Sequence, residues 1–307
     1  MHGRDFLTLA DVSPRELRLI IDTALRLKRE RCPALLDGRS LALVFEKPSL
    51  RTRVSFERAM QQVGGTAIYL SQGEVGMGVR EPVKDIARVL DEYVDVIAAR
   101  TFTQATLVEL AQYARVPVIN ALSDEEHPCQ ALADVLTIHE RFGAVKDVTV
   151  AFIGDGNNVA RSLLSAAAML GAHFVLAVPP GYEPPGDLME AAKSYAMEAG
   201  GSVRIVRDPR EAVAGADVVY TDVWTSMGQE DERIQRQRVF AGYRVDLKLM
   251  QGAKGQAIIM HDLPAHRGEE IVDEAIESPQ SVVFHQAGNR LHAQKALLAL
   301  VLGGVPS

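Results

Sequence analysis

Short apolar runs alternate with longer amphipathic segments along most of the chain. The runs have three to six residues and lie at 41–45, 66–70, 96–99, 117–120, 148–153, 174–178, 203–206, 218–221, 257–260 and 282–284. Between most of them, apolar residues recur every three or four positions, as in 54–63 and 128–138. A short run predicts a buried strand, and the longer spacing predicts a helix. Regular alternation of the two predicts an α/β fold with parallel sheets.

The pattern divides into two halves at the segment 142–147, after which a second series of strands and helices begins. With 307 residues, the chain is longer than one hydrophobic core usually supports. We therefore expect two doubly wound parallel-sheet domains, at 1–143 and 144–287. The last amphipathic run, within 288–303, is long enough to pack back on the first domain. The glycine-rich segment 71–80 lacks periodicity and predicts a mobile loop.

Composition narrows the class of protein. With 47% hydrophobic and 24% charged residues, the chain has the profile of a globular protein. Its net charge of −7 argues against nucleic acid or anionic membranes as partners. The two cysteines, Cys32 and Cys129, are too few for a disulfide framework. The sequence has no signal-peptide pattern. No apolar run approaches the ~18 residues that span a bilayer. These features predict a cytoplasmic protein.

The stretch 45–57, Phe-Glu-Lys-Pro-Ser-Leu-Arg-Thr-Arg-Val-Ser-Phe-Glu, joins a predicted strand to a predicted helix. Ser49 is a good N-cap, and Pro48 keeps the chain extended before it. The first helical turn then presents backbone N–H groups next to Arg51 and Arg53. Helix N-termini and guanidinium groups both favour phosphate. The stretch therefore predicts an anion site, although an ordinary capped helix with solvated arginines has the same local pattern.

Further polar residues in the first half follow predicted strands. Arg100 directly follows the run 96–99 and adds a guanidinium at the same edge of the sheet, because ligands of open parallel sheets gather beyond the carboxyl ends of strands. His127 stands at the start of a predicted helix, where it could donate to a carbonyl oxygen, and Gln130 shares its face one turn later. Taken alone, His127 would more often be a helix cap or a half-buried core histidine.

In the second half, the segment 154–158, Gly-Asp-Gly-Asn-Asn, follows a strand and opens a helix, which is the position of a dinucleotide-binding turn. Such a site normally has an acidic residue about twenty positions later, at the end of the second strand. Here that strand ends at 178–180 in Val-Pro-Pro. We therefore expect the fold without the nucleotide, and we expect the paired asparagines to bind the polar end of a small ligand.

Two more loops follow strands of the second half. Residues 222–228, Asp-Val-Trp-Thr-Ser-Met-Gly, contain a carboxylate, a hydroxyl and the only Trp of the chain. A loop of this kind can close over a ligand with an ammonium group, although a connector with a packed Trp would look alike. Residues 261–264, His-Asp-Leu-Pro, follow another strand, and their carbonyls could face the same ligand. The sequence has no zinc-ligand spacing, P-loop or G-x-S-x-G motif.

Together these motifs resemble the ornithine carbamoyltransferases, within the aspartate/ornithine transcarbamoylase family. The resemblance rests on 45–57, 127–134 (His-Pro-Cys-Gln-Ala-Leu-Ala-Asp), 154–158, 222–230, 261–270 and 289–292 (Asn-Arg-Leu-His), and so covers nearly the whole chain. The arginine motif and His-Pro-x-Gln are shared by the wider family, whereas Asp-x-Trp-x-Ser-Met-Gly is specific to ornithine. An aspartate-using relative should present cations to its second carboxylate, and Asp222 argues against it.

The resemblance implies a transferase with two substrates. Carbamoyl phosphate would be bound by Ser49, Leu50, Arg51, Thr52, Arg100, His127, Gln130 and Arg290. L-Ornithine would be bound by Asn158, Asp222, Ser226, Met227, Asp262 and Leu263. The catalytic residues would be Arg51, Arg100, His127, Asp262 and Arg290. The resemblance also implies no metal or organic cofactor, a homotrimer with active sites at subunit interfaces, and carbamoyl phosphate binding first, before the loop at Ser226 closes.

Three positions depart from the family pattern. Asp262 stands where Cys is usual in His-Cys-Leu-Pro, Leu50 where Thr is commoner, and Gly288 where Glu usually precedes Asn-Arg-Leu-His. A carboxylate at 262 could accept the proton of the δ-ammonium group but would also stabilise its charged form. We therefore expect ornithine transfer with an altered pH dependence. The alternatives are a transcarbamoylase for another amine, such as putrescine, and a non-catalytic paralogue that binds carbamoyl phosphate.

Overall fold

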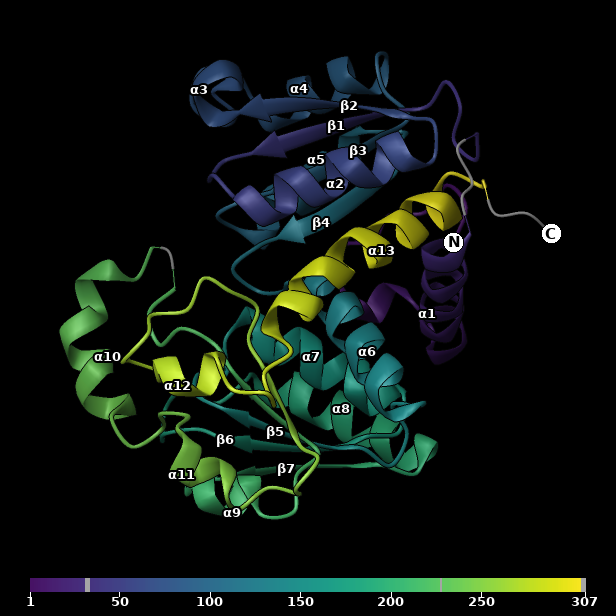
Figure 1. Cartoon of the computed structure of the whole chain (residues 1–307). Coiled ribbons are helices and arrows are strands. Elements are labelled where there is room, and N and C mark those ends of the chain that lie inside the picture. The colour runs from purple at the N-terminus through teal and green to yellow at the C-terminus, as the bar shows by residue number, and fades with distance from the viewer. Residues whose placement is uncertain (31–33, 227, 305–307) are drawn as a thin grey trace. The chain divides into compact units, whose positions relative to one another are not determined.

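The computed structural model of the chain describes residues 1–30, 34–226 and 228–304. The chain forms two compact units, unit 1 with Met1–Leu136 and the chain from Gly288 onward, and unit 2 with Thr137–Ala287. Each unit is a parallel sheet with helices on both faces (Figure 1), which confirms the predicted α/β class. The chain enters unit 2 within α6 (Pro128–Phe142) and leaves it within α13 (Val283–Val301).

The sheet of unit 1 has four parallel strands in the order β2-β1-β3-β4. Their bounds are Ser40–Phe45 (β1), Thr66–Ser71 (β2), Val96–Arg100 (β3) and Val118–Leu122 (β4). β1 and β3 lie in the middle, and all their residues except Ser40 are buried. Because the register pairs Phe45 with Arg100, the turn after β1 and the end of β3 are neighbours at the carboxyl edge of the sheet.

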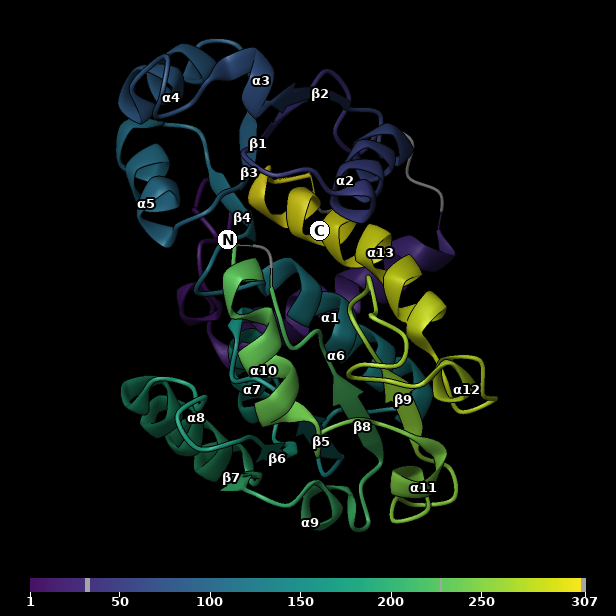
Figure 2. The same ribbon diagram turned by 90° about the vertical axis from the view of Figure 1, so that its left-hand side faces the viewer.

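Helices cover both faces of this sheet. Those before α6 are a 3-10 helix at Leu9–Asp11, α1 (Pro14–Arg29), α2 (Leu50–Gln62), α3 (Gln72–Val75), α4 (Val83–Asp91) and α5 (Gln104–Tyr113). α2 and α13 lie on one face, and α4 and α5 on the other (Figures 1 and 2). Ala42, Val44, Ile97 and Ala99 of the sheet form one hydrophobic cluster with buried residues of α4 and α5. The segment 71–80, predicted as a loop, contains the single-turn helix α3.

Two lysines bind α13 to the rest of unit 1. Lys295 is 5% exposed, and its Nζ donates to the Leu27 carbonyl oxygen (2.7 Å) and to Gln62 Oε1 (2.9 Å). Lys28 Nζ donates to Asn289 Oδ1 (2.7 Å). The end of the chain therefore packs back on the unit in which the chain begins.

The sheet of unit 2 has five parallel strands in the order β7-β6-β5-β8-β9. They are β5 (Thr149–Ile153), β6 (His173–Ala177), β7 (Ser202–Val206), β8 (Val218–Thr221) and β9 (Ile258–Met260). The helices between them and after them are α7 (Asn158–Met169), α8 (Gly186–Ala199), α9 (Pro209–Val213), a 3-10 helix at Glu230–Glu232, α10 (Arg233–Phe240), α11 (Leu247–Met250) and α12 (Asp273–Ile276). α7 and α8 lie on one face of the sheet, and α9 and α11 on the other (Figures 1 and 2).

The strand predicted at 282–284 is wrong, because α13 begins at Val283. A three-residue apolar run does not distinguish a strand from the start of a helix. Within the described residues, no helix is both long and apolar enough to cross a membrane.

β7 follows α8 through a turn of two glycines. Gly200 ends the helix with a φ of 86°, in the left-handed region that favours glycine. Gly201 approaches the chain before β6 so closely that a Cβ would lie 2.2 Å from the carbonyl oxygen of Ala172. Backbone atoms cannot yield as the end of a flexible side chain can, so this turn requires glycine at 201.

Replacing Gly201 by alanine should lower the free energy of unfolding by about 1–3 kcal/mol, because the backbone at Ala172 must move. The matched control is Gly186→Ala at the start of α8, where no atom lies within 4 Å of the added Cβ. Thermal unfolding followed by circular dichroism would compare the two variants. An unchanged midpoint for Gly201→Ala would show that the turn tolerates a side chain.

Candidate active site

The N-terminus of α2 lies at the carboxyl edge of the unit 1 sheet, where the sequence predicts an anion site. Ser49 is the N-cap, and its Oγ accepts from the Thr52 N–H (3.3 Å) and donates to Thr52 Oγ1 (3.1 Å). The Leu50 side chain is 76% exposed. Because leucine has no hydroxyl, position 50 can offer the site only its backbone N–H. The first-turn N–H groups and the positive end of the helix dipole suit an anion.

Arg290 of α13 joins the parts of this site. Its side chain is 2% exposed, Nη1 donates to Gln130 Oε1 (2.8 Å), and Nη2 donates to Thr52 Oγ1 (2.9 Å). Nη1 also lies 3.2 Å from His127 Nε2, which must then be the acceptor, because a guanidinium has no lone pair to offer. Gln130 is held from its other end, since its Nε2 donates to Asp134 Oδ1 (2.8 Å). The structure thus brings Thr52, His127, Gln130 and Arg290 together.

His127 stands immediately before α6 and is 2% exposed. Burial lowers the pKa of His127 well below its usual value, and the charges of Arg290, Arg100, Arg51 and Lys47 lower it further. The imidazole is therefore neutral at neutral pH. Four cations around one neutral ring create a positive potential that favours an anionic ligand.

The cations of this site include Arg51, Arg100 and Arg290, as the sequence predicts, but Lys47 joins them and Arg53 does not. Arg100 ends β3 and is 6% exposed. Lys47 is 8% exposed, and its Nζ lies 5.0 Å from the centre of the Phe102 ring. The pattern does not single out Lys47, although it stands two residues before the N-cap of α2. Arg53, which the pattern does include, has a side chain 48% exposed and donates to Glu57 (2.9 Å).

In unit 2, the glycine-rich turn between β5 and α7 is covered by protein. A Cβ on Gly156 would lie 2.6 Å from the Pro184 ring and from the Tyr182 carbonyl oxygen, which also accepts from the Gly156 N–H (2.9 Å). The turn therefore packs directly against the segment that contains Tyr182 and Pro184. Asn157 caps α7, and Asn158 is the first residue of that helix.

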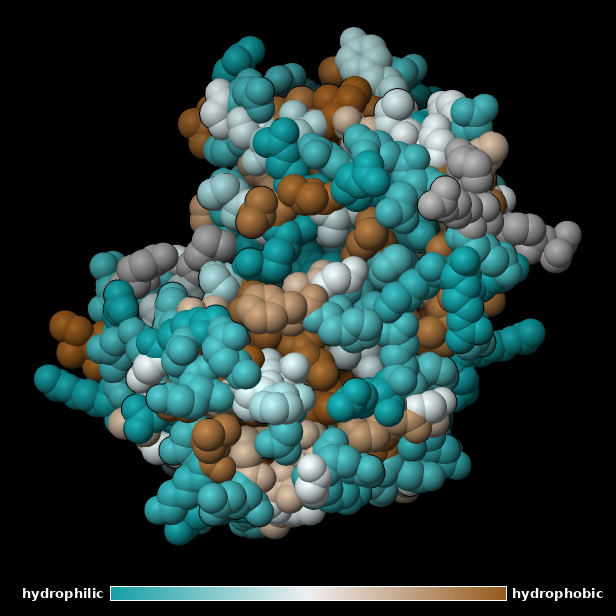
Figure 3. Space-filling model, viewed as in Figure 1, coloured by the Kyte–Doolittle hydropathy of each residue, from teal (hydrophilic) through white to brown (hydrophobic). Residues whose placement is uncertain are grey.

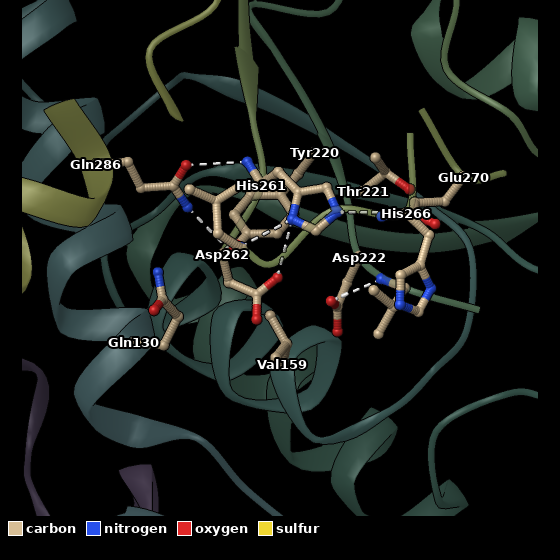
Figure 4. Close-up of polar contacts among 12 residues, drawn as sticks. Gln130, Val159, Tyr220, Thr221, Asp222, His261, Asp262, His266, Glu270 and Gln286 are labelled. Carbon is tan, nitrogen blue, oxygen red and sulfur yellow. Dashed lines mark hydrogen bonds and ion pairs between the residues drawn. The ribbon is translucent and has the colours of Figure 1, made fainter. Parts of the chain in front are cut away.

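Two carboxyl groups and an imidazole meet after β8 and β9 (Figure 4). One side-chain atom each of Asp222, His261 and Asp262 lies within 4.8 Å of the others. His261 Nε2 lies 3.1 Å from Glu270 Oε1, and Nδ1 lies 3.3 Å from Asp262 Oδ1. Burial and the Asp262 charge raise the pKa of Asp222 well above its usual value. The pair Asp222 and Asp262 therefore holds a proton more readily than a solvated carboxylate would.

His261 is fully buried beside carboxyl groups. Burial lowers the pKa of His261, but the neighbouring carboxyl groups of Asp262 and Glu270 raise the pKa above its usual value. Leu263, with a φ of 60°, directs its N–H at His261 Nδ1 (2.9 Å). While the Leu263 N–H donates to Nδ1, the lone pair of that nitrogen is occupied and cannot bind a metal ion. The ring can take up a second proton only if this hydrogen bond breaks. The group is suited to holding and passing a proton.

The loop after β8 contains the remaining residues predicted to bind the acceptor. Asp222 is its first residue and is 5% exposed, and Ser226 is partly buried. Met227 lies outside the described residues. The Trp224 carbonyl oxygen accepts from Arg236 Nη1 (3.1 Å). The sequence does not single out Arg236, because a charged helix normally indicates a solvated face.

Two family models cover nearly the whole chain. The carbamoyl-P binding domain of aspartate/ornithine carbamoyltransferase matches residues 4–140, and the Asp/Orn binding domain matches residues 146–301. The chain belongs to the aspartate/ornithine carbamoyltransferase family. It is a carbamoyltransferase, and the resemblance stated from its motifs is confirmed.

Individual relatives are similar along their full length. The ornithine carbamoyltransferase of Hyperthermus butylicus is 53% identical, over 98% of each chain. A protein of Pyrococcus furiosus named "Ornithine carbamoyltransferase, anabolic" is 51% identical, over 99% of this chain and 98% of its own. The solved structure of ornithine carbamoyltransferase from Pyrococcus furiosus superimposes with a TM-score of 0.96 at 50% identity, over 99% of both chains.

We predict that His127 makes the protein less stable as the pH falls. Its pKa is lowered in the folded chain, so below about pH 6.5 the unfolded chain binds a proton that the folded chain does not. The free energy of unfolding then falls on acidification, by at most about 1.4 kcal/mol per pH unit from this group. Urea unfolding should show that the free energy of unfolding falls less between about pH 7 and about pH 5 in His127→Gln than in the native chain, because glutamine does not titrate. Parallel losses would show that His127 is protonated in the folded chain.

Proposed function

We propose that this protein transfers the carbamoyl group of carbamoyl phosphate to the δ-amine of L-ornithine, giving L-citrulline and phosphate. Its full-length relatives bear the name ornithine carbamoyltransferase. The observation that carries the proposal is the Arg290 guanidinium, which gathers Thr52, His127 and Gln130 into one buried polar site in unit 1. In unit 2, the buried carboxyl group of Asp222 supports an acceptor with an ammonium group.

Carbamoyl phosphate fits the chemistry of the unit 1 site. Its phosphate would bind at the N-terminus of α2, through the Ser49 and Thr52 hydroxyls, the Leu50 N–H and the Arg51 side chain. Arg100, at the end of the neighbouring strand, would complete the phosphate site. His127, Gln130 and Arg290 would address the carbamoyl group. Both ends of the substrate would then have a partner of complementary charge or hydrogen-bonding capacity.

L-Ornithine fits the residues of unit 2. Asp222 would bind the α-ammonium group, and Asn158, Ser226 and Met227 would hold the rest of the amino-acid end. Asp262 and the backbone at Leu263 would face the δ-amine. Asp222 would ionise as ornithine binds, because the α-ammonium group replaces the bound proton as its partner.

The reaction requires a neutral δ-amine, and an ordinary amine of this kind has a pKa near ~10.4. Asp262 would accept the proton, and its contact with His261 would share the charge. The amine then attacks the carbamoyl carbon, while Arg51, His127 and Arg290 stabilise the negative charge that develops on the carbamoyl oxygen. The bond from carbon to the phosphate oxygen breaks, the departing phosphate takes the second proton that the attacking nitrogen must lose, and phosphate remains among the arginines until it leaves.

We further propose a homotrimer, or a multiple of trimers, located in the cytoplasm. Unit 1 exposes apolar side chains on α2, β2 and the chain after β3, with exposed fractions of 76% for Leu50, 46% for Val54, 51% for Ile68 and 51% for Phe102. Figure 3 shows hydrophobic side chains at the surface of the face that it draws. Several such residues on neighbouring elements fit a face that a second subunit covers. The free, buried thiol of Cys129 fits a reducing compartment.

We expect the purified chain to form more carbamoylated product from L-ornithine than from putrescine or L-aspartate. Asp222 would bind the α-ammonium group of ornithine and leave its δ-amine to react, whereas L-aspartate has no second amine and putrescine lacks the carboxylate of an amino-acid end. A colorimetric assay across this panel of amines, with carbamoyl phosphate present, would measure it. His127→Asn, the control for enzymatic turnover, should lose about 10²–10³-fold in rate. Product from putrescine with little from ornithine would identify another acceptor, and no product from any amine would indicate a non-catalytic paralogue.

Asp262→Cys should move the pH dependence of citrulline formation to higher pH. The native carboxyl pair accepts a proton once it has ionised, whereas a thiol has an ordinary pKa near ~8.5 and a higher one when buried. Initial rates with both substrates saturating, from about pH 6 to about pH 10, would compare the two enzymes. Asp262→Asn cannot take up the proton and should be slower throughout. Identical profiles for the native chain and Asp262→Cys would remove Asp262 from the proton transfer.

A further inference from the structure

The glycine-rich turn at 154–158 makes two side-chain contacts that bear on the loop after β8. We name residues 222–226 the acceptor loop. Asn157 Nδ2 donates to Asp222 Oδ2 (2.7 Å), at the first residue of this loop. Asp155 Oδ2 accepts from Arg236 Nη1 (2.6 Å), on α10 after the loop. The turn that would hold a nucleotide in other α/β proteins therefore holds the two flanks of the acceptor loop.

Arg236 links the turn to the backbone of the loop itself. Its side chain is 7% exposed, and Nη1 donates both to Asp155 and to the Trp224 carbonyl oxygen (3.1 Å). Its Nε donates to Glu232 Oε2 (2.8 Å), and its guanidinium lies 5.1 Å from the centre of the Tyr182 ring. A guanidinium is planar, with donors at fixed angles. Its three other partners, Asp155, Glu232 and Tyr182, thus fix the guanidinium that positions the carbonyl group of Trp224.

The side chain of Trp224 is fixed by α10 as well. Its ring stacks on Phe240, with centroids 6.1 Å apart and an interplanar angle of 21°. Trp224 is 4% exposed, and Phe240 is fully buried. Both the backbone and the side chain of the residue at the middle of the acceptor loop are therefore held by α10, two residues before Ser226.

Removing only one partner of the Asp155–Arg236 pair should destabilise the protein, because both groups are buried. Burial raises the pKa of Asp155, and the Arg236 charge lowers it. Removing only the guanidinium leaves a buried carboxyl group without its cation, which is the costly case for buried pairs. Asp155 follows the central strand β5, whereas the acceptor loop has no strand or helix of its own. The acceptor loop therefore depends on this network for its position.

We propose that Arg236, anchored by Asp155, is a positioning residue that sets the affinity for the amino-acid substrate by fixing the acceptor loop, without touching the substrate. The inference rests on the proposed ornithine transfer and assigns a role to the Gly-Asp-Gly turn. Its consequence is selective: loss of Arg236 should weaken binding of the amino acid in unit 2 and leave the carbamoyl phosphate site of unit 1 as it is.

The test compares Arg236→Gln, Arg236→Lys and Asp155→Asn with the native chain. Arg236→Gln should raise the KM for L-ornithine about tenfold or more, since charged hydrogen bonds to Asp155 and Trp224 are lost. The KM for carbamoyl phosphate should change less than about twofold. Arg236→Lys keeps the charge but lacks the planar guanidinium that holds both partners. Its KM for L-ornithine should therefore lie between those of the native chain and of Arg236→Gln. Asp155→Asn keeps an acceptor oxygen and should raise the KM for ornithine less than Arg236→Gln does.

The matched control is Arg233→Gln. Arg233 lies on the same helix but is 56% exposed and pairs with Glu269, so its loss should leave both KM values unchanged. The single tryptophan provides a second measurement. Its fluorescence should change when L-norvaline, which has the carbon chain of ornithine without the nucleophilic amine, binds with carbamoyl phosphate. This change should need higher norvaline concentrations in Arg236→Gln.

The outcomes separate the two proposals. If the native chain makes no citrulline, the proposed function fails. If it makes citrulline while Arg236→Gln keeps the native KM for ornithine and the native norvaline titration, the positioning role is wrong. A lower unfolding temperature with equal rises in both KM values would assign Arg236 a purely structural role and also overturn the inference.

Discussion

A guanidinium group cannot be buried without acceptors around it, and Arg290 obtains them from α2 and from the start of α6. Thr52, His127 and Gln130 must therefore keep fixed positions, and the N-terminal ends of α2 and α6 are fixed with them. The same charge contributes to the low pKa of His127. One residue thereby fixes the geometry of the unit 1 site and, together with burial and the neighbouring cations, keeps its imidazole neutral.

The sequence predicts the strands well because a buried strand leaves an uninterrupted apolar run. It also places the polar motifs at the carboxyl ends of strands, since that follows from the alternation of strand and helix. It does not predict side-chain direction. Arg51 and Arg53 look equivalent in the motif, yet two residues are about 200° apart around a helix, and Arg53 pairs with Glu57. Lys47, outside the helix, is among the cations whose charge acts on His127.

Unit 2 illustrates a different limit of sequence patterns. Its glycine-rich turn has the composition of a nucleotide site, but the residues that cover it, Tyr182 and Pro184, are more than twenty positions away and form no motif. In the same way, Asp262 appears in the sequence as a single departure from a family pattern. In the fold, it is a second carboxyl group beside Asp222 and beside His261. A substitution that looks local therefore alters the proton balance of three coupled groups.

The path of the chain has a consequence for the protein during its synthesis. Thr52 and Arg290 are hydrogen-bonded across 238 residues of sequence. The ribosome must complete all of unit 2 before it makes the last buried element of the unit that it began first. Until then, Thr52, His127 and Gln130 lack the cation around which they are arranged, and the inner face of α2 lacks part of its cover. Unit 1 is thus the longer-lived incomplete intermediate on the ribosome, and it is the unit for which premature termination near the carboxyl end is most damaging.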